Sequence, residues 1–255
     1  MGDERGVIRC RARLGTIAAM QGDFDEALPL LEESVRAHAG LGDVARTATS
    51  LANLGVARLL VGALEDARSL LEEALALHRK RGATLDSAQA SISLGELELA
   101  RGDADSARAR FEEAAALGRR ARAAHVESDA LVGLATVAIR GGEVDIAASE
   151  LAKAMQLSGG RALVLPLILE RIAEVAIARG QYERGAELVG AAAARRENMR
   201  MPLPPVAVPL HRRQLDTLRD RLGPQAMAQA LARGVSSVPT EGGPEGHSTS
   251  LVTSF

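Results

Sequence analysis

Apolar residues recur along this chain at intervals of three and four, which is the spacing of an amphipathic α-helix. Residues 53–75 read NLGVARLLVGALEDARSLLEEAL and show the pattern clearly, but they also contain two glycines, Gly55 and Gly62. A glycine inside a helix costs about 1 kcal/mol relative to alanine, so both glycines require a structural reason. The pattern predicts two helices in this stretch, joined by a turn.

This stretch is one copy of an internal repeat. The pattern returns with a period of 40, as from Leu14 to Leu54, and a last copy follows at a step of 38. Such recurrence indicates a repeat architecture and predicts stacked helix–turn–helix units. Five features keep the register: Leu14, Leu54, Leu94 and Leu134; Gly15, Gly55, Gly95 and Ala135; Gly22, Gly62, Gly102 and Gly142; Ala27, Ala67, Ala107 and Ala147; and Leu31, Leu71, Phe111 and Leu151, with Ile172, Ala173, Gly180, Gly185 and Val189 in the last copy.

Each feature has a physical role in a helix–turn–helix unit. The first glycine, such as Gly55, lies in mid-helix, where the missing side chain allows the paired helix to approach closely. The second, such as Gly62, ends the helix, because the residue after a helix often adopts the left-handed conformation that glycine reaches freely. Asp23 and Asp103 directly follow such glycines and are expected to cap the next helix. The recurring alanine gives the second helix a small surface, and the large residue four positions later projects from that helix toward the paired one.

The repeat resembles the tetratricopeptide repeat (TPR), whose L-G and A-x-x-x-F elements recur here in the same order and spacing. The period of 40 exceeds that family's usual length of about 34 residues, the expected aromatic residue three positions after the glycine is absent, and no proline closes the units. The longer period implies longer helices, as in a variant found in large bacterial regulators. The matching positions are Leu54-Gly55 with Ala67-x-x-x-Leu71, and Ala107-x-x-x-Phe111.

The sequence therefore predicts an all-α, right-handed TPR-like solenoid of about five helix–turn–helix repeats with a two-helix C-terminal cap. Capping helices are expected within 196–235, one from about Ala207 to Leu222 and a short one that starts at Gly223-Pro224. Residues 236–255 are rich in glycine, serine and proline and predict a disordered tail. The repeat array is expected to span residues 1–195, with repeats at about 3–41, 42–81, 82–121, 122–159 and 160–195.

The C-terminal part of the chain carries a second resemblance. GAELVGAAAARRENMRMPLPP, a following helix with an LRDRLG element and a short alanine-rich helix are similar to the C-terminus of large actinobacterial ATP-dependent transcriptional regulators of the LuxR or AfsR type. Those proteins join a nucleotide-binding module to a repeat arm. The resemblance implies that this chain is the sensor or partner-binding arm of a bacterial signalling or transcriptional regulator, although the family's nucleotide and DNA motifs have no counterparts here. A free-standing TPR adaptor or scaffold is the alternative.

The chain opens in register with the repeat, because the pair Gly2-Asp3 stands one full period before the pair Gly42-Asp43. Solenoids usually need a polar terminal unit to cover the last apolar face. We therefore expect that a missing N-terminal nucleotide-binding module covers the first repeat, or that a second copy of the chain does so by self-association.

Composition narrows the functional classes further. The net charge of −2 and the pI of about 6.2 do not fit a phosphate-binding surface, so direct nucleic-acid binding is not expected. No apolar run reaches the roughly 20 residues that a membrane-spanning helix needs, so no membrane association is expected. The single cysteine, Cys10, agrees with a cytoplasmic location and is expected to be a small core residue.

No constellation of residues predicts catalysis, so we expect no enzyme activity and no catalytic, cofactor-binding or metal-binding residue. Residues 242–248 lack the spacing and the lysine of a phosphate loop. His38 and His78, one repeat apart near the ends of second helices, are interpreted as cations that favour the helix dipole rather than as zinc ligands. The acidic pairs at 32–33, 72–73 and 112–113 are interpreted as a solvated helix face rather than as a catalytic pair.

The first helices of the repeats are expected to line a concave groove of mixed, mildly apolar character. Such a groove is compatible with a protein or peptide partner, bound as a helix or as an extended segment. The carboxylate clamp of the chaperone-binding TPR proteins is matched only by Asn53, so that activity is not expected. The array is equally compatible with a lever whose groove stays empty. The candidate groove residues are Thr16, Thr49, Asn53, Val56, Gln89, Ile92, Glu96, Leu99, Asp129, Val132 and Thr136.

Overall fold

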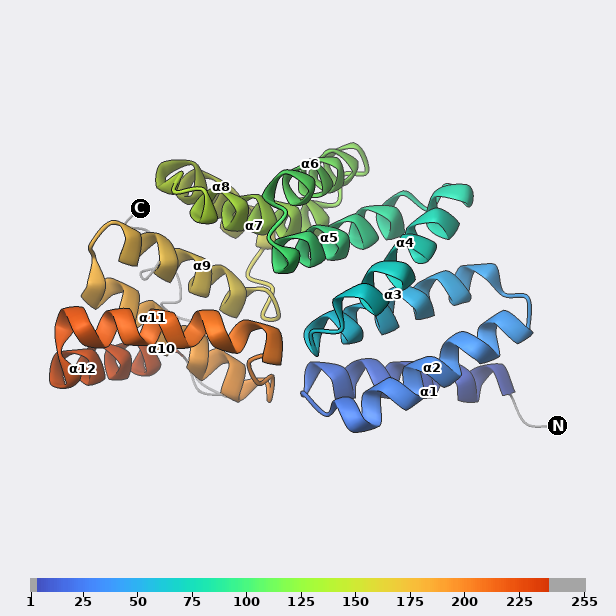
Figure 1. Ribbon diagram of the computed structural model, residues 1–255, viewed down its shortest axis with the longest axis horizontal. Helices are drawn as coiled ribbons and strands as arrows, with labels where there is room; N and C mark the ends of the chain where they lie inside the picture. Colours follow the sequence, from blue (N-terminus) through green and yellow to red (C-terminus); the bar gives the residue numbers. More distant parts are fainter. Residues whose placement is uncertain (1–3, 239–255) are drawn as a thin grey trace. The chain divides into compact units, whose positions relative to one another are not determined.

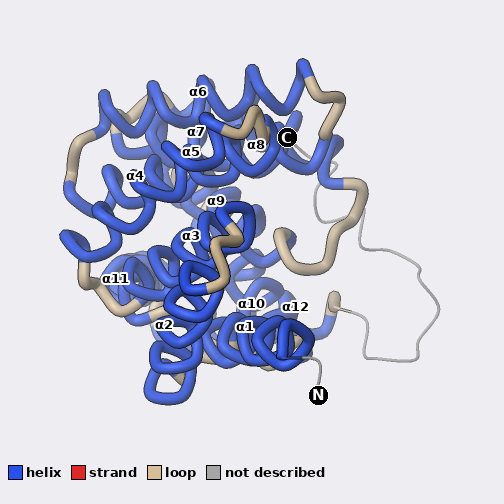
Figure 2. The backbone as a smooth tube through the Cα atoms, turned by 90° about the vertical axis from the view of Figure 1, so that its right-hand side faces the viewer, coloured by secondary structure: helices blue, strands red, loops and turns tan. Residues whose placement is uncertain are grey.

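The computed structural model of the chain describes residues 4–238, and apart from one short 3₁₀ turn all regular structure in this range is α-helical (Figure 1, Figure 2). The predicted all-α repeat fold is therefore confirmed. The helices are α1 (Glu4–Met20), α2 (Phe24–Gly40), α3 (Val44–Leu60), α4 (Leu64–Lys80), α5 (Thr84–Arg101), α6 (Ala104–Arg120), α7 (Ala124–Arg140), α8 (Val144–Ser158), α9 (Leu165–Ala178), α10 (Tyr182–Asn198), α11 (Val208–Leu222) and α12 (Pro224–Ser236).

The first ten helices follow one another along the chain as the pairs α1–α2 to α9–α10, and α11 and α12 come after them. α10 ends at Asn198 and α12 at Ser236, beyond the limits of 195 and 235 expected for the last repeat and the cap, and the domain limits stay a prediction. Most of the predicted disordered tail, residues 239–255, lies outside the described residues. The chain divides into two compact units. The first unit comprises the residues up to Val126 together with Pro202–Val206, and the second comprises Glu127–Met201 together with the residues from Ala207 onward.

The mid-helix glycines bring the two helices of a pair into close contact. A methyl group at Gly55 on α3 would lie 2.8 Å from Cγ of Leu71 on α4, and one at Gly95 on α5 would lie 2.7 Å from Cε1 of Phe111 on α6. Both large side chains are fully buried. Only a residue without a side chain leaves room for them, so the role predicted for the first glycine is confirmed.

One turn geometry joins the first eight helices, whose starting positions from Glu4 to Val144 are evenly spaced at half the repeat period. Arg122 adopts the central left-handed conformation between α6 and α7, with a φ of +54°, although this conformation costs a residue with a side chain about 1–2 kcal/mol. The other six turns place glycine at this position. The predicted turn role of the second glycine is therefore confirmed, and the turns between repeats use the same left-handed conformation. Their φ values lie between +65° and +86° at Gly22, Gly42, Gly62, Gly82, Gly102 and Gly142.

Aspartates that follow these turns cap the next helix. The carboxylates of Asp23, Asp43 and Asp103 accept hydrogen bonds from backbone N–H groups three residues later, at 3.2, 3.1 and 3.0 Å. The caps predicted at Asp23 and Asp103 are confirmed. Ser106 donates from both its backbone and its hydroxyl to Asp103, and these bonds lower the pKa of that carboxyl.

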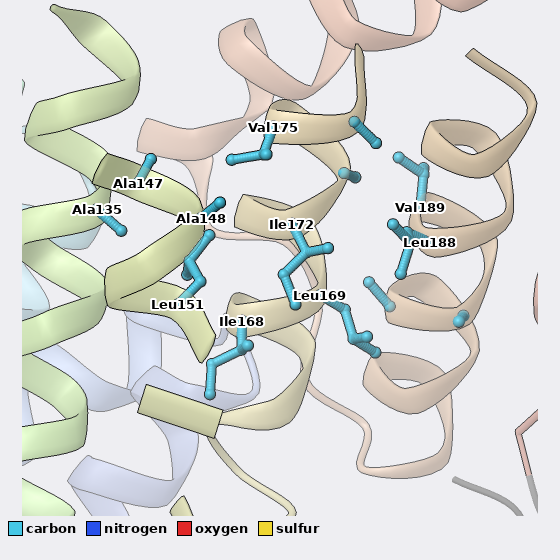
Figure 3. Close-up of a cluster of buried hydrophobic side chains, with 14 of the residues drawn as sticks. Ala135, Ala147, Ala148, Leu151, Ile168, Leu169, Ile172, Val175, Leu188 and Val189 are labelled. Atoms are coloured by element: carbon cyan, nitrogen blue, oxygen red, sulfur yellow. The ribbon is translucent and has the colours of Figure 1, made fainter. Parts of the chain in front are cut away.

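Aliphatic side chains form the core of the second unit (Figure 3). Small residues such as Ala135 on α7 and Ala147 on α8 lie beside larger ones such as Leu151, while Ile168 and Ile172 project from α9. Alanine lets neighbouring backbones approach, so the branched side chains of one helix fill the space between them without aromatic rings. This packing agrees with the aromatic content of only 2%.

Replacing Gly95 with alanine tests the helix-pair contact. The added methyl group favours the helix by about 1 kcal/mol, but it would overlap the ring of Phe111, and overpacking of a core costs about 1–3 kcal/mol. We expect a lower Tm and a lower free energy of unfolding for Gly95→Ala in thermal and urea unfolding. The matched control is Gly40→Ala at the end of α2, where open space surrounds the new methyl group and Tm should not fall. Equal behaviour of the two variants would contradict the packing role.

The cap at Asp103 makes the stability of the chain depend on pH. Because the folded-state pKa of Asp103 lies below its ordinary value of 3.8, the carboxylate stabilises the fold above that value, and this contribution disappears as pH falls through the folded-state pKa. Asp103→Asn keeps a cap that does not titrate. We expect wild type to lose Tm relative to Asp103→Asn as pH is lowered from about 6 to about 2, measured by thermal unfolding. Parallel curves for these two proteins would contradict the assignment, and Asp105→Asn in the same helical turn is the control that should follow wild type.

Candidate functional site

A pocket opens in the first unit beside α1, α3 and α5, with the end of α4 contributing to its wall. Its volume is about 260 Å³. All but one of the lining residues belong to the first helix of a repeat. They are Thr16, Ala19 and Met20 on α1; Thr49, Ala52, Asn53, Val56, Ala57 and Leu60 on α3; His78 on α4; and Asp86, Gln89, Ala90 and Ser93 on α5.

Two amide side chains are available for hydrogen bonding in the wall of the pocket. The hydroxyls of Thr16, Thr49 and Ser93 donate to carbonyl oxygens of their own helices, at 3.0, 3.2 and 3.3 Å. Asn53 and Gln89 form no side-chain hydrogen bond within the part of the chain that the structure describes. Each amide offers two donors and one acceptor, so a partner can be bound here through its backbone groups.

The structure brings five of the eleven candidate groove residues together in this pocket. Three others, Ile92, Leu99 and Val132, are buried and leave little surface for a partner. A helix has one face toward the groove and a wide face toward the core, and the repeat pattern alone does not separate their borders. The five pocket residues are Thr16, Thr49, Asn53, Val56 and Gln89.

The remaining candidates lie elsewhere. Glu96 is exposed on α5 but does not line the pocket. Asp129 and Thr136 belong to α7 in the second unit, where Arg161 donates to Asp129 at 3.2 Å and the Thr136 hydroxyl donates to the carbonyl oxygen of Val132 at 2.8 Å. Both polar groups are thus engaged within their own unit.

Nine of the fourteen lining residues were not among the predicted groove residues, and His78 and Asp86 are the two of these with titratable side chains. The interpretation of His38 and His78 as cations at helix ends is wrong, because only 4% and 2% of these residues are exposed. Burial is the main cause that lowers the pKa of both imidazoles, so both are neutral near pH 7. The position at a helix end can be read from the sequence, but the burial of that helix face depends on the next repeat.

The two histidines have different neighbours. Nδ1 of His38 lies 2.9 Å from the hydroxyl of Ser50 and 3.4 Å from that of Ser34, and the two hydroxyls are 2.8 Å apart. One repeat later, alanines occupy both serine positions. Nδ1 of His78 is buried without a hydrogen-bond partner, and Oδ2 of Asp86 lies 3.8 Å from it, which is too far for a hydrogen bond.

Cys10 is exposed on α1, so the prediction of a core position is wrong. Its counterparts one and two repeats later, Ser50 and Ala90, are buried. Among the described residues no helix pair precedes α1, so the α1 face that would contact such a pair is open. A core assignment based on residue type could not anticipate this difference.

The acidic pairs of the second helices are only partly solvated. Glu73 and Glu112 are exposed, as predicted. Glu32 accepts a hydrogen bond from Arg58 at 2.6 Å, and Glu113 accepts one from Ser91 at 3.2 Å. These two acids therefore connect a second helix to the first helix of the same or the next repeat.

Two ion pairs lie buried in the second unit. Arg196 on α10 donates to both carboxylate oxygens of Glu170 on α9, at 2.6 and 3.1 Å. Arg171 lies 2.8 Å from Glu174 within α9, and burial is the main cause that raises the pKa of Glu174. The pair of Arg196 and Glu170 therefore connects α10 to α9, whereas the pair of Arg171 and Glu174 lies within α9. Within the described residues no cluster of His, Cys, Asp and Glu side chains could hold a metal ion.

No helix of the described chain combines the length and the apolar character needed to cross a bilayer.

Paired helices with a glycine contact, uniform turns and a pocket lined by first helices define a TPR-like α-helical repeat protein. A model of the MalT-like TPR region matches residues 4–218, and the chain belongs to this family. A search of curated proteins found no significant match. Repeat families of this kind are generally non-catalytic scaffolds, and the TPR-like fold suggests a protein–protein interaction module.

Solved structures share the fold at low sequence identity. TPR-like repeats of a Podosopora anserina chain described as a kinesin light chain align at a TM-score of 0.55 and 19% identity, over 78% of this chain and 99% of that chain. A single-residue variant of the same repeats gives a TM-score of 0.55 and 18% identity, over 79% of this chain and 100% of that chain. The MamA protein aligns at a TM-score of 0.45 and 21% identity, over 75% of this chain and 92% of that chain.

Proposed function

We propose that the chain is a non-catalytic module that binds a protein partner, and that the pocket of the first unit holds an extended segment of that partner. The observation that carries the proposal is the pair of unengaged amides, Asn53 and Gln89, in an otherwise mildly apolar wall. Amides on neighbouring helices can donate to and accept from the backbone of an extended peptide. The side chains of Ala52, Val56 and Leu60 supply apolar surface beside them.

Removing both amides should weaken peptide binding without unfolding the chain. Peptides are first selected from a random phage library on the immobilised full chain. We expect Asn53→Ala/Gln89→Ala to raise the Kd of these peptides about tenfold or more in isothermal titration calorimetry, because two hydrogen bonds of about 1 kcal/mol each are lost. The Tm should change little, since neither amide is bonded within the described chain.

A second double variant is the control for surface changes in general. Glu73→Ala/Glu112→Ala removes two exposed carboxylates from second helices, outside the pocket, and should leave the Kd unchanged. If all selected peptides bind wild type and Asn53→Ala/Gln89→Ala equally, the binding surface lies elsewhere and the proposed groove is wrong.

We further propose that the module is the arm of a bacterial signalling or transcriptional regulator. Two findings support this: the match to the MalT-like TPR region, and the open face of α1. Leu14 is 55% exposed, whereas its counterparts Leu54 and Leu94 are 6% and 0% exposed. Ile17 is likewise exposed and its counterpart Ala57 is buried. An apolar face with buried counterparts in the next repeats fits another helix pair, from a preceding module or from a second copy of the chain.

The chain on its own should therefore self-associate through α1. We expect sedimentation velocity to show a dimer that grows with concentration, and Leu14→Glu/Ile17→Glu to remain monomeric, because buried carboxylates oppose association. Cys10 is the single cysteine and lies on the same helix, so its rate of maleimide labelling should fall as wild type associates.

Ile146→Glu is the matched control, because Ile146 is similarly exposed but lies on α8. This variant should associate as wild type does. A wild-type chain that stays monomeric, with Cys10 labelled equally fast at all concentrations, would remove the support that the α1 face gives to the arm.

A further inference from the structure

We infer that the pocket of the first unit selects a partner segment by a cationic side chain, a lysine or an arginine, bound between Nδ1 of His78 and the carboxylate of Asp86. The inference rests on the proposed peptide-binding function of this pocket and adds the chemistry of the side chain that it accepts. Both protein groups line the pocket.

His78 supplies an unused acceptor. Its Nδ1 is buried and has no hydrogen-bond partner within the described chain. A buried polar atom without a partner is destabilising, so native proteins rarely keep one unless water or a ligand satisfies it. Burial lowers the pKa of His78, which keeps the ring neutral and leaves a ring nitrogen free to accept an N–H.

Asp86 supplies the charge. It is the only residue with a formal charge among those that line the pocket, and its side chain is 59% exposed at the rim. Arg81 also lies near enough to lower the pKa of His78, but it does not line the pocket. Nδ1 of His78 and Oδ2 of Asp86 are 3.8 Å apart, so one ammonium or guanidinium group can donate to both at about 2.9 Å.

The first repeat shows the same site in a closed form. There the hydroxyls of Ser34 and Ser50 are hydrogen-bonded to Nδ1 of His38. In the second repeat alanines stand at both serine positions, so no hydroxyl is there to bond Nδ1 of His78. The register counterpart of Asp86 is Arg46, which pairs with Asp43 at 3.7 Å. The closed site thus carries an arginine, paired with Asp43, at the position where the open site carries a carboxylate, so of these two sites the second favours a cation.

The size of the pocket fits a side chain of a partner. Its volume of about 260 Å³ lies below the roughly 300–1,000 Å³ that is typical of sites for drug-sized ligands. The aliphatic stem of a lysine can lie along Ala52, Val56 and Ala90, while its ammonium group reaches the two polar groups.

Imidazole NMR on the full chain tests the inference. Nα-acetyl-lysine methylamide is titrated into the ¹⁵N-labelled protein, and the ring nitrogens of His78, assigned through His78→Gln, are followed. The matched probe is Nα-acetyl-norleucine methylamide, which keeps the aliphatic stem but lacks the ammonium group. We expect the lysine probe to shift Nδ1 of His78 in a saturable manner, and the norleucine probe to bind at least about tenfold more weakly, since it cannot form the charged hydrogen bonds.

Three variants locate the effect. Ala90→Ser copies Ser50 and should bond Nδ1 of His78, so the lysine-induced shift should be lost. Asp86→Asn removes the charge and should weaken the lysine probe about tenfold without affecting the norleucine probe. Ser50→Ala opens the histidine site of the first repeat, which still carries Arg46, and should leave the response of His78 unchanged. Amide spectra of each variant check that the chain is folded.

Equal binding of the two probes, or a lysine response that survives in folded Ala90→Ser, would overturn the inference. The phage peptides separate this outcome from a failure of the proposed function. Peptides that depend on Asn53 and Gln89 but carry no lysine or arginine would leave the function standing and remove the cation site. A lysine response at His78, together with peptides whose Kd does not depend on Asn53 and Gln89, would leave the cation site standing and remove the proposed function.

Discussion

The contact between a mid-helix glycine and a large side chain of the paired helix is the interaction on which the rest of the structure depends. Gly55 faces Leu71 and Gly95 faces Phe111 at distances that exclude any side chain on the first helix. This contact fixes the separation of the two helices in a pair and hence the place of the next pair. The first helices α1, α3 and α5 then border one pocket, which alanines keep open. Packing of this kind needs few residues in each repeat, so chains that share only 18% of their residues with this one can share the fold.

Much of the fold could be predicted because its signals are local. The position of Gly62 after a run of apolar residues predicts a turn, and the position of Asp103 after such a glycine predicts a helix cap. The pocket could be predicted only in part. Val56 was found because it lies on a first helix, whereas His78 was missed because it reaches the pocket from a second helix, and Cys10 was misplaced because its exposure depends on what covers α1. These properties depend on neighbours in space, and no residue type reveals them.

Three buried polar sites in the chain are satisfied to different degrees. In the second unit, Glu170 and Arg196 neutralise each other across two helices. In the first repeat, two serines bond Nδ1 of His38, while its Nε2 is buried without a hydrogen-bond partner. His78 has neither kind of partner, and a buried donor or acceptor left unpaired costs about 1–3 kcal/mol. The sequence of the second repeat, with alanines where the first has serines, retains this cost at the one histidine that lines the pocket.

The uniform spacing of the turns has a consequence for how the chain chooses its pairs. From α1 to α8 the helices begin at equal intervals along the chain, and the same left-handed bend follows each of the first seven. The spacing of the bends therefore does not distinguish a hairpin within a repeat from the connection between two repeats, although φ at the bend is 76–86° in the former and 54–67° in the latter. The choice of partner helix lies in the side chains, where the space beside Gly55 accepts Leu71. Loss of a single second helix would keep the bends evenly spaced but would place two first helices side by side, with no large side chain to fill the space beside their glycines. An array of this design can therefore grow or shrink only by whole helix pairs.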